Sequence, residues 1–232
     1  LSQEDFIAQV NRIGLAVIGQ SEGLAPADKK LYALRDVTGT VDSIPLIASS
    51  VMSKKLASGA QAILLDVKVG SGAFMKTIEE ARALAKAMVD IGRENGRSVK
   101  AVLTDMDRPL GHAIGNALEI REVIDTLKGH GPEDLTHECI IMAAHMLVLS
   151  HICDYETALT RVCEALDSGA ALERLRLMID AQGGDSSVID DENLLAIGQY
   201  TYDVIATQTG FITHMNTEQC GIASVMLGAG RT

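Results

Sequence analysis

Apolar residues recur with two different spacings along the chain, and each spacing predicts a different kind of element. Between residues 77 and 95 they return every three or four positions, which predicts an amphipathic helix. Residues 62–69 form a short, nearly continuous aliphatic run, which is typical of a buried strand. Further helices are predicted at residues 2–11, 113–127, 132–150, 155–168, 170–182 and 217–227. Further strands are predicted at residues 15–18, 99–103, 204–207 and 210–213.

The order strand, helix, strand over residues 62–103 indicates a parallel pair of strands with a right-handed crossover. We therefore predict an α/β fold, in which a small helical element at residues 21–57 lies beside a mixed or parallel sheet domain that is covered by helices. Residues 1–20 would begin the sheet domain and residues 58–200 would form most of it. Residues 183–192 are rich in glycine and acidic residues and lack periodicity, which predicts a mobile loop.

Two short helices joined by a tight turn are predicted within the small helical element. Pro26 suits the first turn of a helix. Thr38-Gly39 would end that helix, because glycine adopts the left-handed C-terminal conformation at little cost. A second helix follows at once, with Asp42 or Ser43 as its N-terminal cap.

Four polar side chains project from these two helices. Tyr32 and Arg35 are three positions apart on the first helix, and Ser50 and Lys54 are four apart on the second, so each pair shares a face. Arg and Lys can donate to the carbonyl oxygens of a flat base such as uracil or thymine, and Ser can meet its N–H group. If the base departs as an anion, the two cations also stabilise charge that develops during the reaction. Spacing alone favours a plainer interpretation, because polar residues on amphipathic helices are usually solvated surface.

A glycine-rich turn, Gly70-Ser-Gly-Ala-Phe74, follows the strand at residues 62–69. Such a turn can offer backbone N–H groups to an anion, although this one matches neither a dinucleotide fingerprint nor a P-loop. Phe74 would place its ring against a flat base. Asp105 and Asp107 also follow a strand, but residues two apart in a turn need not share a face, so a metal or acid–base role is not favoured.

Composition and charge restrict the class of protein. The 232 residues are 47% hydrophobic and 22% charged, which is typical of a globular protein with one or two domains. A formal net charge of −11 argues against a nucleic-acid partner, because phosphate backbones require clustered Lys and Arg. The longest apolar run, at residues 140–149, is too short to span a bilayer. The four cysteines lack CxxC spacing, which argues against zinc and favours free thiols in the cytoplasm.

Three stretches of the sequence give a more specific indication. The run Lys30-Leu-Tyr-Ala-Leu-Arg-Asp-Val-Thr-Gly-Thr-Val-Asp-Ser-Ile-Pro-Leu-Ile-Ala-Ser-Ser50 is followed by Lys54-Lys55 and by Asp66-Val-Lys-Val-Gly-Ser-Gly-Ala-Phe74. Together they closely resemble the pyrimidine-nucleoside phosphorylase and thymidine phosphorylase family, and the resemblance covers nearly the whole chain. It implies that Arg35, Ser50 and Lys54 bind the pyrimidine. It further implies that Arg35 and Lys54 act in catalysis and that Tyr32 and Phe74 line the pocket.

The resemblance also implies a reaction, namely the reversible phosphorolysis of uridine, thymidine or deoxyuridine to the free base and a (deoxy)ribose 1-phosphate. Inorganic phosphate would be the co-substrate of this pentosyl transfer, and no organic cofactor is expected. The backbone carbonyls of Leu110 and Ala113 and the carboxylate of Glu122 would ligate a monovalent cation such as potassium. The resemblance implies a homodimer.

Members of this family carry a Lys-His-Ser, glycine-rich phosphate site upstream of the point where this sequence begins, and a C-terminal lobe that would start within residues 201–232. We therefore expect a partial chain that holds the base-binding half of the site and does not turn over substrate by itself. Two alternatives stay open, a related anthranilate phosphoribosyltransferase, whose acidic magnesium motif we do not find, and a non-catalytic binding module. The sequence does not determine a preference for thymidine or uridine.

Overall fold

The structure is a computed structural model that describes residues 1–19 and 23–230. The expected boundary between residues 20 and 21, and the last two residues of the expected C-terminal segment, lie outside this range. The elements are α1 (Gln3–Ile13), α2 (Pro26–Thr38), α3 (Ile44–Ala57), β1 (Ala62–Val69), α4 (Ile78–Glu94), β2 (Ser98–Asp105), α5 (Asn116–Leu127), α6 (Glu133–Leu149), α7 (Tyr155–Asp167), α8 (Ala170–Ala181), the 3-10 helices η1 (Ser186–Ile189) and η2 (Glu192–Leu194), and α9 (Thr217–Met226). Of these helices, none has both the length and the apolar character needed to cross a membrane.

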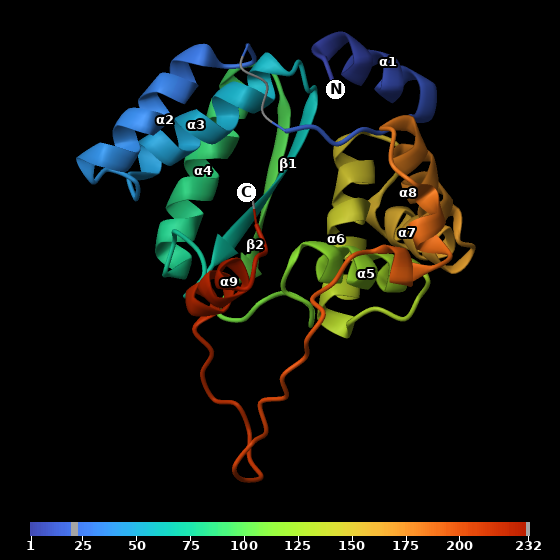
Figure 1. The fold of residues 1–232 in the computed structure, drawn as a ribbon. Coiled ribbons are helices and arrows are strands. Elements are labelled where there is room, and N and C mark those ends of the chain that lie inside the picture. The colour runs from blue at the N-terminus through green and yellow to red at the C-terminus, as the bar shows by residue number, and fades with distance from the viewer. Residues whose placement is uncertain (20–22, 231–232) are drawn as a thin grey trace.

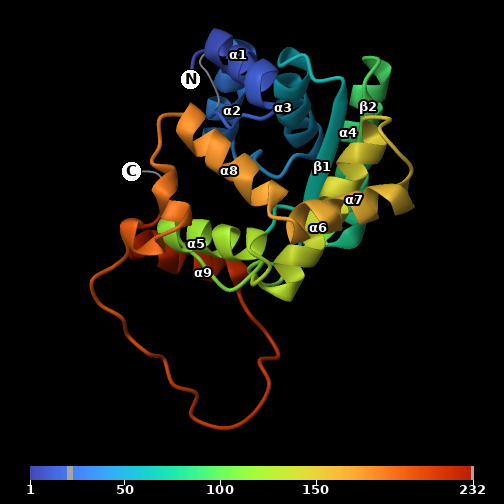
Figure 2. The same ribbon diagram turned by 90° about the vertical axis from the view of Figure 1, so that its right-hand side faces the viewer.

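The two strands form a parallel pair. Ala62 lies opposite Ser98 at one end of the pair, and Val69 lies opposite Asp105 at the other. Because α4 connects the strands, the predicted crossover unit and the α/β class are both confirmed. Figure 1 shows α2, α3 and α4 on one side of the strands and α5 to α8 on the other. The same chain is seen from a second direction in Figure 2.

The main hydrophobic core lies between the strands and the helices α3 and α4. Met52 of α3 is fully buried there. Gly92 allows α4 to approach its neighbours closely, because a Cβ atom at this position would lie 2.2 Å from Val99 Cγ2 and 3.1 Å from Met52 Cε. A capping box between Thr77 and Glu80 fixes the start of α4, within one residue of the predicted limit.

On the other side of the strands, Lys68 joins β1 to α6. Its Nζ lies 2.6 Å from Glu138 Oε1 and 2.9 Å from Asp66 Oδ2. Desolvation lowers the pKa of Lys68, but its hydrogen bonds to the two carboxylates outweigh that effect, so the pKa is raised overall. The ion pair therefore ties the sheet to the helices on this side.

The predicted strand at residues 15–18 is wrong. The backbone of Val17 bonds to a side chain: its N–H donates to Gln182 Oε1 at 3.0 Å, and Gln182 Nε2 donates back to the Val17 carbonyl at 2.8 Å. Gln9 Nε2 donates to the carbonyl of Leu15 at 3.1 Å. Amide side chains after α8 and on α1 thus satisfy backbone groups that a neighbouring strand would otherwise satisfy.

The two strands predicted at residues 204–207 and 210–213 are also wrong. Residues 195–216 contain neither helix nor strand and project away from the rest of the protein between η2 and α9 (Figures 1 and 2). We call this segment the excursion. It exposes large apolar side chains, namely Ile197, Tyr200, Tyr202, Val204, Ile205, Phe211 and Ile212. In the described part of the chain no strand lies beside it, so its strand-like pattern has no partner.

The expected loop at residues 183–192 contains η1 and the first residue of η2. Asp185 caps the first of these turns, where its Oδ1 accepts the N–H of Ser187 at 3.0 Å. Ile189 is 1% exposed, so a fully buried side chain anchors the segment. Its lack of long-range periodicity reflects short 3-10 turns and not an unstructured loop.

Candidate functional site

The structure confirms the two short helices of the small helical element. Pro26 occupies the first turn of α2, and Gly39 ends that helix with φ 66°. Ser43 is the N-cap residue of α3, as predicted, but its side chain makes no capping hydrogen bond. The turn between these helices sets α2 beside α3, so that polar side chains from both line one cavity.

That cavity, which we call the α2–α3 cavity, has a volume of about 230 Å³. Tyr32, Arg35 and Ser50 all line it. Arg35 is only 5% exposed, and its Cζ lies 4.6 Å from the centroid of the Tyr32 ring. Its buried Nε has no hydrogen-bond partner, and among the described residues no carboxylate pairs with it. A buried guanidinium normally has such a partner, so the Nε of Arg35 retains an unused hydrogen-bond donor.

Lys54 reaches the same group of side chains from the next turn of α3. Its Nζ donates to Ser50 Oγ at 3.0 Å and to Asp28 Oδ2 at 2.6 Å. The structure therefore brings Arg35, Ser50 and Lys54 together, as expected from the sequence. It also adds Asp28, which lines the cavity and is 8% exposed. The sequence alone shows only an acidic residue in the first turn of a helix.

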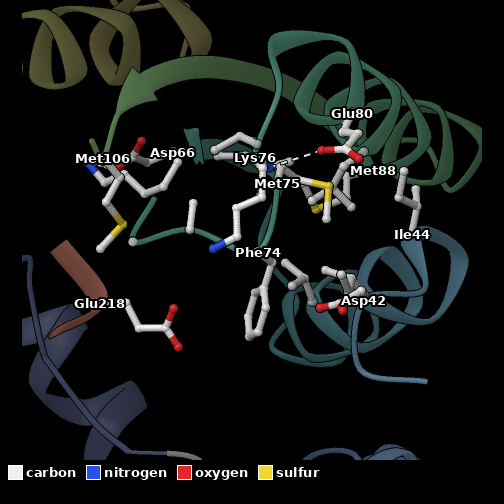
Figure 3. Close-up of a pocket in the computed structure, with 18 residues that line it drawn as sticks. Asp42, Ile44, Asp66, Phe74, Met75, Lys76, Glu80, Met88, Met106 and Glu218 are labelled. Carbon is white, nitrogen blue, oxygen red and sulfur yellow. Dashed lines mark hydrogen bonds and ion pairs between the residues drawn. The ribbon is translucent and has the colours of Figure 1, made fainter. Parts of the chain in front are cut away.

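Phe74 lies elsewhere. It is 54% exposed and lines a larger cavity of about 850 Å³, together with Ile47 and Val51 of α3. Figure 3 shows its ring projecting into that space, with Glu218 on one side and Asp42 on the other. The structure does not bring Phe74 into the α2–α3 cavity, which is lined by residues of another face of α3.

The backbone N–H groups of Gly70 to Ala73, in the glycine-rich turn after β1, all donate to groups within the protein. The N–H of Gly70 donates to the Met75 carbonyl at 3.1 Å, and that of Ser71 donates to Asp107 Oδ1 at 2.7 Å. Gly72 donates to the Met106 carbonyl at 3.0 Å. These N–H groups are therefore not free to bind an anion as the sequence suggested, and Asp107 has a structural role.

The same turn is the docking point of α9. A Cβ atom on Gly72 would lie 2.6 Å from Thr217 Cγ2, so glycine is needed for the helix to approach. Ser71 Oγ donates to the carbonyl of Met215 at 3.4 Å. The chain thus returns from the excursion to the end of β1.

The residues expected to hold a cation are only partly assembled. Glu122 Oε1 accepts the N–H groups of His112 at 2.8 Å and Ala113 at 2.9 Å, beside a cavity of about 480 Å³. Leu110 lines a different cavity. No cluster of three His, Cys, Asp or Glu side chains suited to a metal occurs among the described residues. One carboxylate and two backbone carbonyls would give a ligand set made only of oxygen atoms, which suits a hard cation. Glu122 Oε2 accepts no hydrogen bond from the described residues, so it could be one of these ligands.

Among the described residues, no histidine or cysteine lines the α2–α3 cavity. His145 stacks on Tyr155 with ring centroids 4.8 Å apart. Burial and the nearby charge of Lys100 lower the pKa of His145. Burial raises the pKa of the Cys139 thiol, and all four cysteines are free.

The parallel crossover unit covered by helices, with a polar cavity in an attached helical pair, matches a known class of protein. A family model described as "Glycosyl transferase family, a/b domain" matches residues 1–172, so the chain belongs to this family. Its relatives include proteins named pyrimidine-nucleoside phosphorylase from Staphylococcus aureus (strain bovine RF122 / ET3-1) and Staphylococcus haemolyticus (strain JCSC1435). Each is 55% identical over 232 residues, which is 100% of this chain and 54% of the relative. The chain therefore spans about half the length of these relatives, and the resemblance found in the sequence is confirmed.

Proposed function

We infer that the protein supplies the base-binding part of a pyrimidine-nucleoside phosphorylase. This enzyme would split uridine, thymidine or deoxyuridine with inorganic phosphate into the free base and a (deoxy)ribose 1-phosphate. The observation that carries the proposal is the side chain of Arg35, which lines the same cavity as Ser50 and whose buried Nε has no hydrogen-bond partner. The name of the Staphylococcus relatives supports the same activity.

The chemistry assigned to the site follows from its donors. In the reaction, a phosphate oxygen attacks the anomeric carbon while the bond from that carbon to the base nitrogen breaks. The bonding electrons leave with the base, which carries a negative charge until it takes up a proton. Arg35 and Lys54 would stabilise that charge at the base oxygens, and Ser50 would bond to the base edge. Tyr32, whose ring lies against the Arg35 guanidinium, would hold that donor in position.

Phe74 could contact the same base as Arg35 only after a conformational change. Its ring lies in the larger cavity, on another side of α3 from Arg35. A shift of the α2–α3 pair relative to the strands would be needed before Phe74 could lie against the same base. In the complete enzyme such a shift would accompany closure of the cleft over both substrates.

Three further assignments belong to the complete enzyme. We propose potassium as the cation held by Glu122 and the carbonyls of Leu110 and Ala113, a homodimer as the assembly, and the cytoplasm as the location. We also propose that residues 21–57 act as a base-binding segment attached to the sheet domain. No organic cofactor is part of the proposed reaction.

Equilibrium dialysis with radiolabelled uracil tests the proposed site directly. We expect saturable binding by the wild-type chain, and a loss of affinity of tenfold or more in Arg35→Met and Lys54→Met. Lys55→Met is the matched control, because Lys55 follows Lys54 directly and is exposed. Absence of saturable binding, or an equal effect of Lys55→Met, would contradict the proposal.

A second assay separates the enzyme from a binding module. Release of uracil from uridine, measured with and without inorganic phosphate, is expected for the full-length enzyme and only when phosphate is present. For the chain described here we expect binding without turnover. Hydrolysis that is independent of phosphate would contradict phosphorolysis.

A further inference from the structure

The carboxylate of Asp28 is buried in the wall of the α2–α3 cavity. Asp28 is the third residue of α2, where the helix dipole favours a negative charge. Its side chain is 9% exposed and its Oδ2 lies 2.6 Å from Lys54 Nζ. Pro26 and the first turn of α2 thus place an anion next to one of the two proposed base-binding cations.

The ammonium group of Lys54 has three donors, and two are already used. One bonds to Asp28 Oδ2 and one to Ser50 Oγ. The third is left for a ligand. A lysine side chain has four rotatable carbon bonds, so two fixed hydrogen bonds remove most of its freedom before a ligand arrives. The direction of the remaining donor is therefore set by Asp28 and Ser50 together.

Asp28 also adjusts the charge of the site. Arg35 and Lys54 contribute two positive charges, and Asp28 contributes one negative charge. The excess of one positive charge equals the charge of a single departing base anion. Without Asp28, two cations would lie close together at a partly buried site with no compensating group, which is costly.

The Lys54–Asp28 pair differs from ordinary surface pairs of this protein. Lys86 and Asp90 are four residues apart on α4, and their side chains are 77% and 44% exposed. Lys54 and Asp28 lie on different helices, and their side chains are 24% and 9% exposed. An exposed pair within one helix contributes little, whereas a buried pair fixes the geometry of its members.

We propose that Asp28 is a positioning residue of the base-binding site, which holds Lys54 Nζ beside Ser50 Oγ so that one N–H is directed at the base. This inference rests on the proposed function. It assigns to Asp28 no contact with the base and no proton transfer. Its effect on binding is exerted through Lys54, because it fixes the position of that ammonium group and balances its charge.

A double-mutant cycle on uracil binding tests this role. We expect Asp28→Asn to weaken uracil binding about tenfold in the wild-type background and less than twofold in a Lys54→Met background. Asp28→Glu keeps the charge and should recover part of the lost affinity. Asp90→Asn, which removes the exposed partner of Lys86, is the matched control and should leave affinity unchanged. Thermal unfolding of each variant shows whether it is folded.

The possible outcomes separate the two proposals. If the wild-type chain does not bind uracil, or Lys54→Met binds it as tightly as wild type does, the base-binding site is overturned and the role of Asp28 with it. If Lys54→Met binds weakly but Asp28→Asn weakens binding equally in both backgrounds, only the role of Asp28 is overturned. The same holds if Asp28→Asn binds uracil as tightly as wild type or more tightly, because Lys54 would then not need Asp28 to hold it in position. If Asp28→Asn does not fold, the comparison of Asp28→Glu across the two backgrounds decides in the same way.

Discussion

The guanidinium of Arg35 lies over the ring of Tyr32, with its Cζ 4.6 Å from the ring centroid. Tyr32 is 42% exposed, whereas Arg35 is 5% exposed, so the ring shields the cation from solvent on one side. The contact combines cation–π attraction with burial of the planar group. It fixes a donor that has no other partner at its Nε.

Removal of the Tyr32 ring should weaken base binding. A cation–π contact contributes on the order of 0.5–2 kcal/mol, so we expect Tyr32→Ala to reduce uracil affinity about twofold to thirtyfold. Tyr32→Phe keeps the ring and should stay within about twofold of wild type. Equilibrium dialysis measures both. Equal losses in the two variants would mean that the hydroxyl, and not the stacked ring, matters.

A methyl group added at Gly92 should destabilise the core. Because its Cβ would lie 2.2 Å from Val99 Cγ2, Gly92→Ala must displace the Val99 side chain or move α4 away from β2. Overpacking of this kind costs about 1–3 kcal/mol. Urea denaturation should show the loss as a lower midpoint with an unchanged slope.

Gly221 provides the control for this substitution. It lies within α9, and a Cβ atom there would meet no atom within 4 Å. Gly221→Ala should be neutral or stabilising by up to about 1 kcal/mol, because alanine has the higher helix propensity. If Gly92→Ala were equally harmless, the close approach of α4 to β2 would be contradicted.

The capping box of α4 should make stability depend on pH. Backbone N–H groups of Thr77 and Lys76, at 3.1 and 3.0 Å from Glu80 Oε2, lower the pKa of Glu80. The folded pKa is below the unfolded one, so the charged carboxylate stabilises the fold above the unfolded pKa of about 4.3. That contribution is lost as the pH falls through the folded pKa.

We therefore expect Glu80→Gln to be less stable than wild type at pH 7 and to approach wild-type stability in acid. Thermal unfolding between pH 7 and pH 3 measures the difference. Glu79→Gln is the control from the same turn and should show a smaller gap. A gap for Glu80→Gln that stayed constant over this range would rule out the charge as its cause.

Potassium should stabilise the fold through Glu122. If the cation binds the folded state only, potassium chloride should raise the unfolding temperature above its value in choline chloride of equal ionic strength. Glu122→Gln should remove that difference. Substitution also leaves the N–H groups of His112 and Ala113 with a weaker acceptor, so the informative quantity is the salt dependence and not the absolute midpoint. Equal midpoints of wild type in the two salts would contradict the cation site.

Local sequence rules were sufficient to predict the strand–helix–strand unit formed by β1, α4 and β2. The aliphatic run predicts both ends of β1, and the Thr77-x-x-Glu80 capping box fixes where α4 begins. Ser2 caps α1 in the same way and is part of a second capping box. These signals depend on residues within one turn of each other, so they can be read without the fold.

Long-range partners explain the errors. The aliphatic residues 15–18 have the pattern of a strand, but Gln182, 165 residues beyond Val17, supplies the hydrogen bonds. Residues 204–207 and 210–213 also carry strand-like side chains, yet their backbone meets no neighbouring strand in the described structure. Strand formation depends on a partner more than on propensity, so sequence pattern alone was a poor guide at both places.

The candidate site was predictable only in part. Helical spacing and the family resemblance selected Arg35, Ser50 and Lys54, which the structure brings together. Asp28 was missed as a site residue because its contact with Lys54 joins two helices across 26 positions. Phe74 was expected in the same pocket, whereas the structure places it in another cavity. Relations between elements, unlike those within a helix, cannot be read from spacing.

The excursion should be the place where a protease cleaves the folded protein. Its exposed aromatic residues, Tyr200, Tyr202 and Phe211, are substrates for chymotrypsin on a segment without regular hydrogen bonding. The C-terminal piece would still be held after cleavage, because Gly230 N–H donates to Asn116 Oδ1 at 2.9 Å and α9 packs on Gly72. One cut should therefore yield two bands on a denaturing gel and a single species on a sizing column.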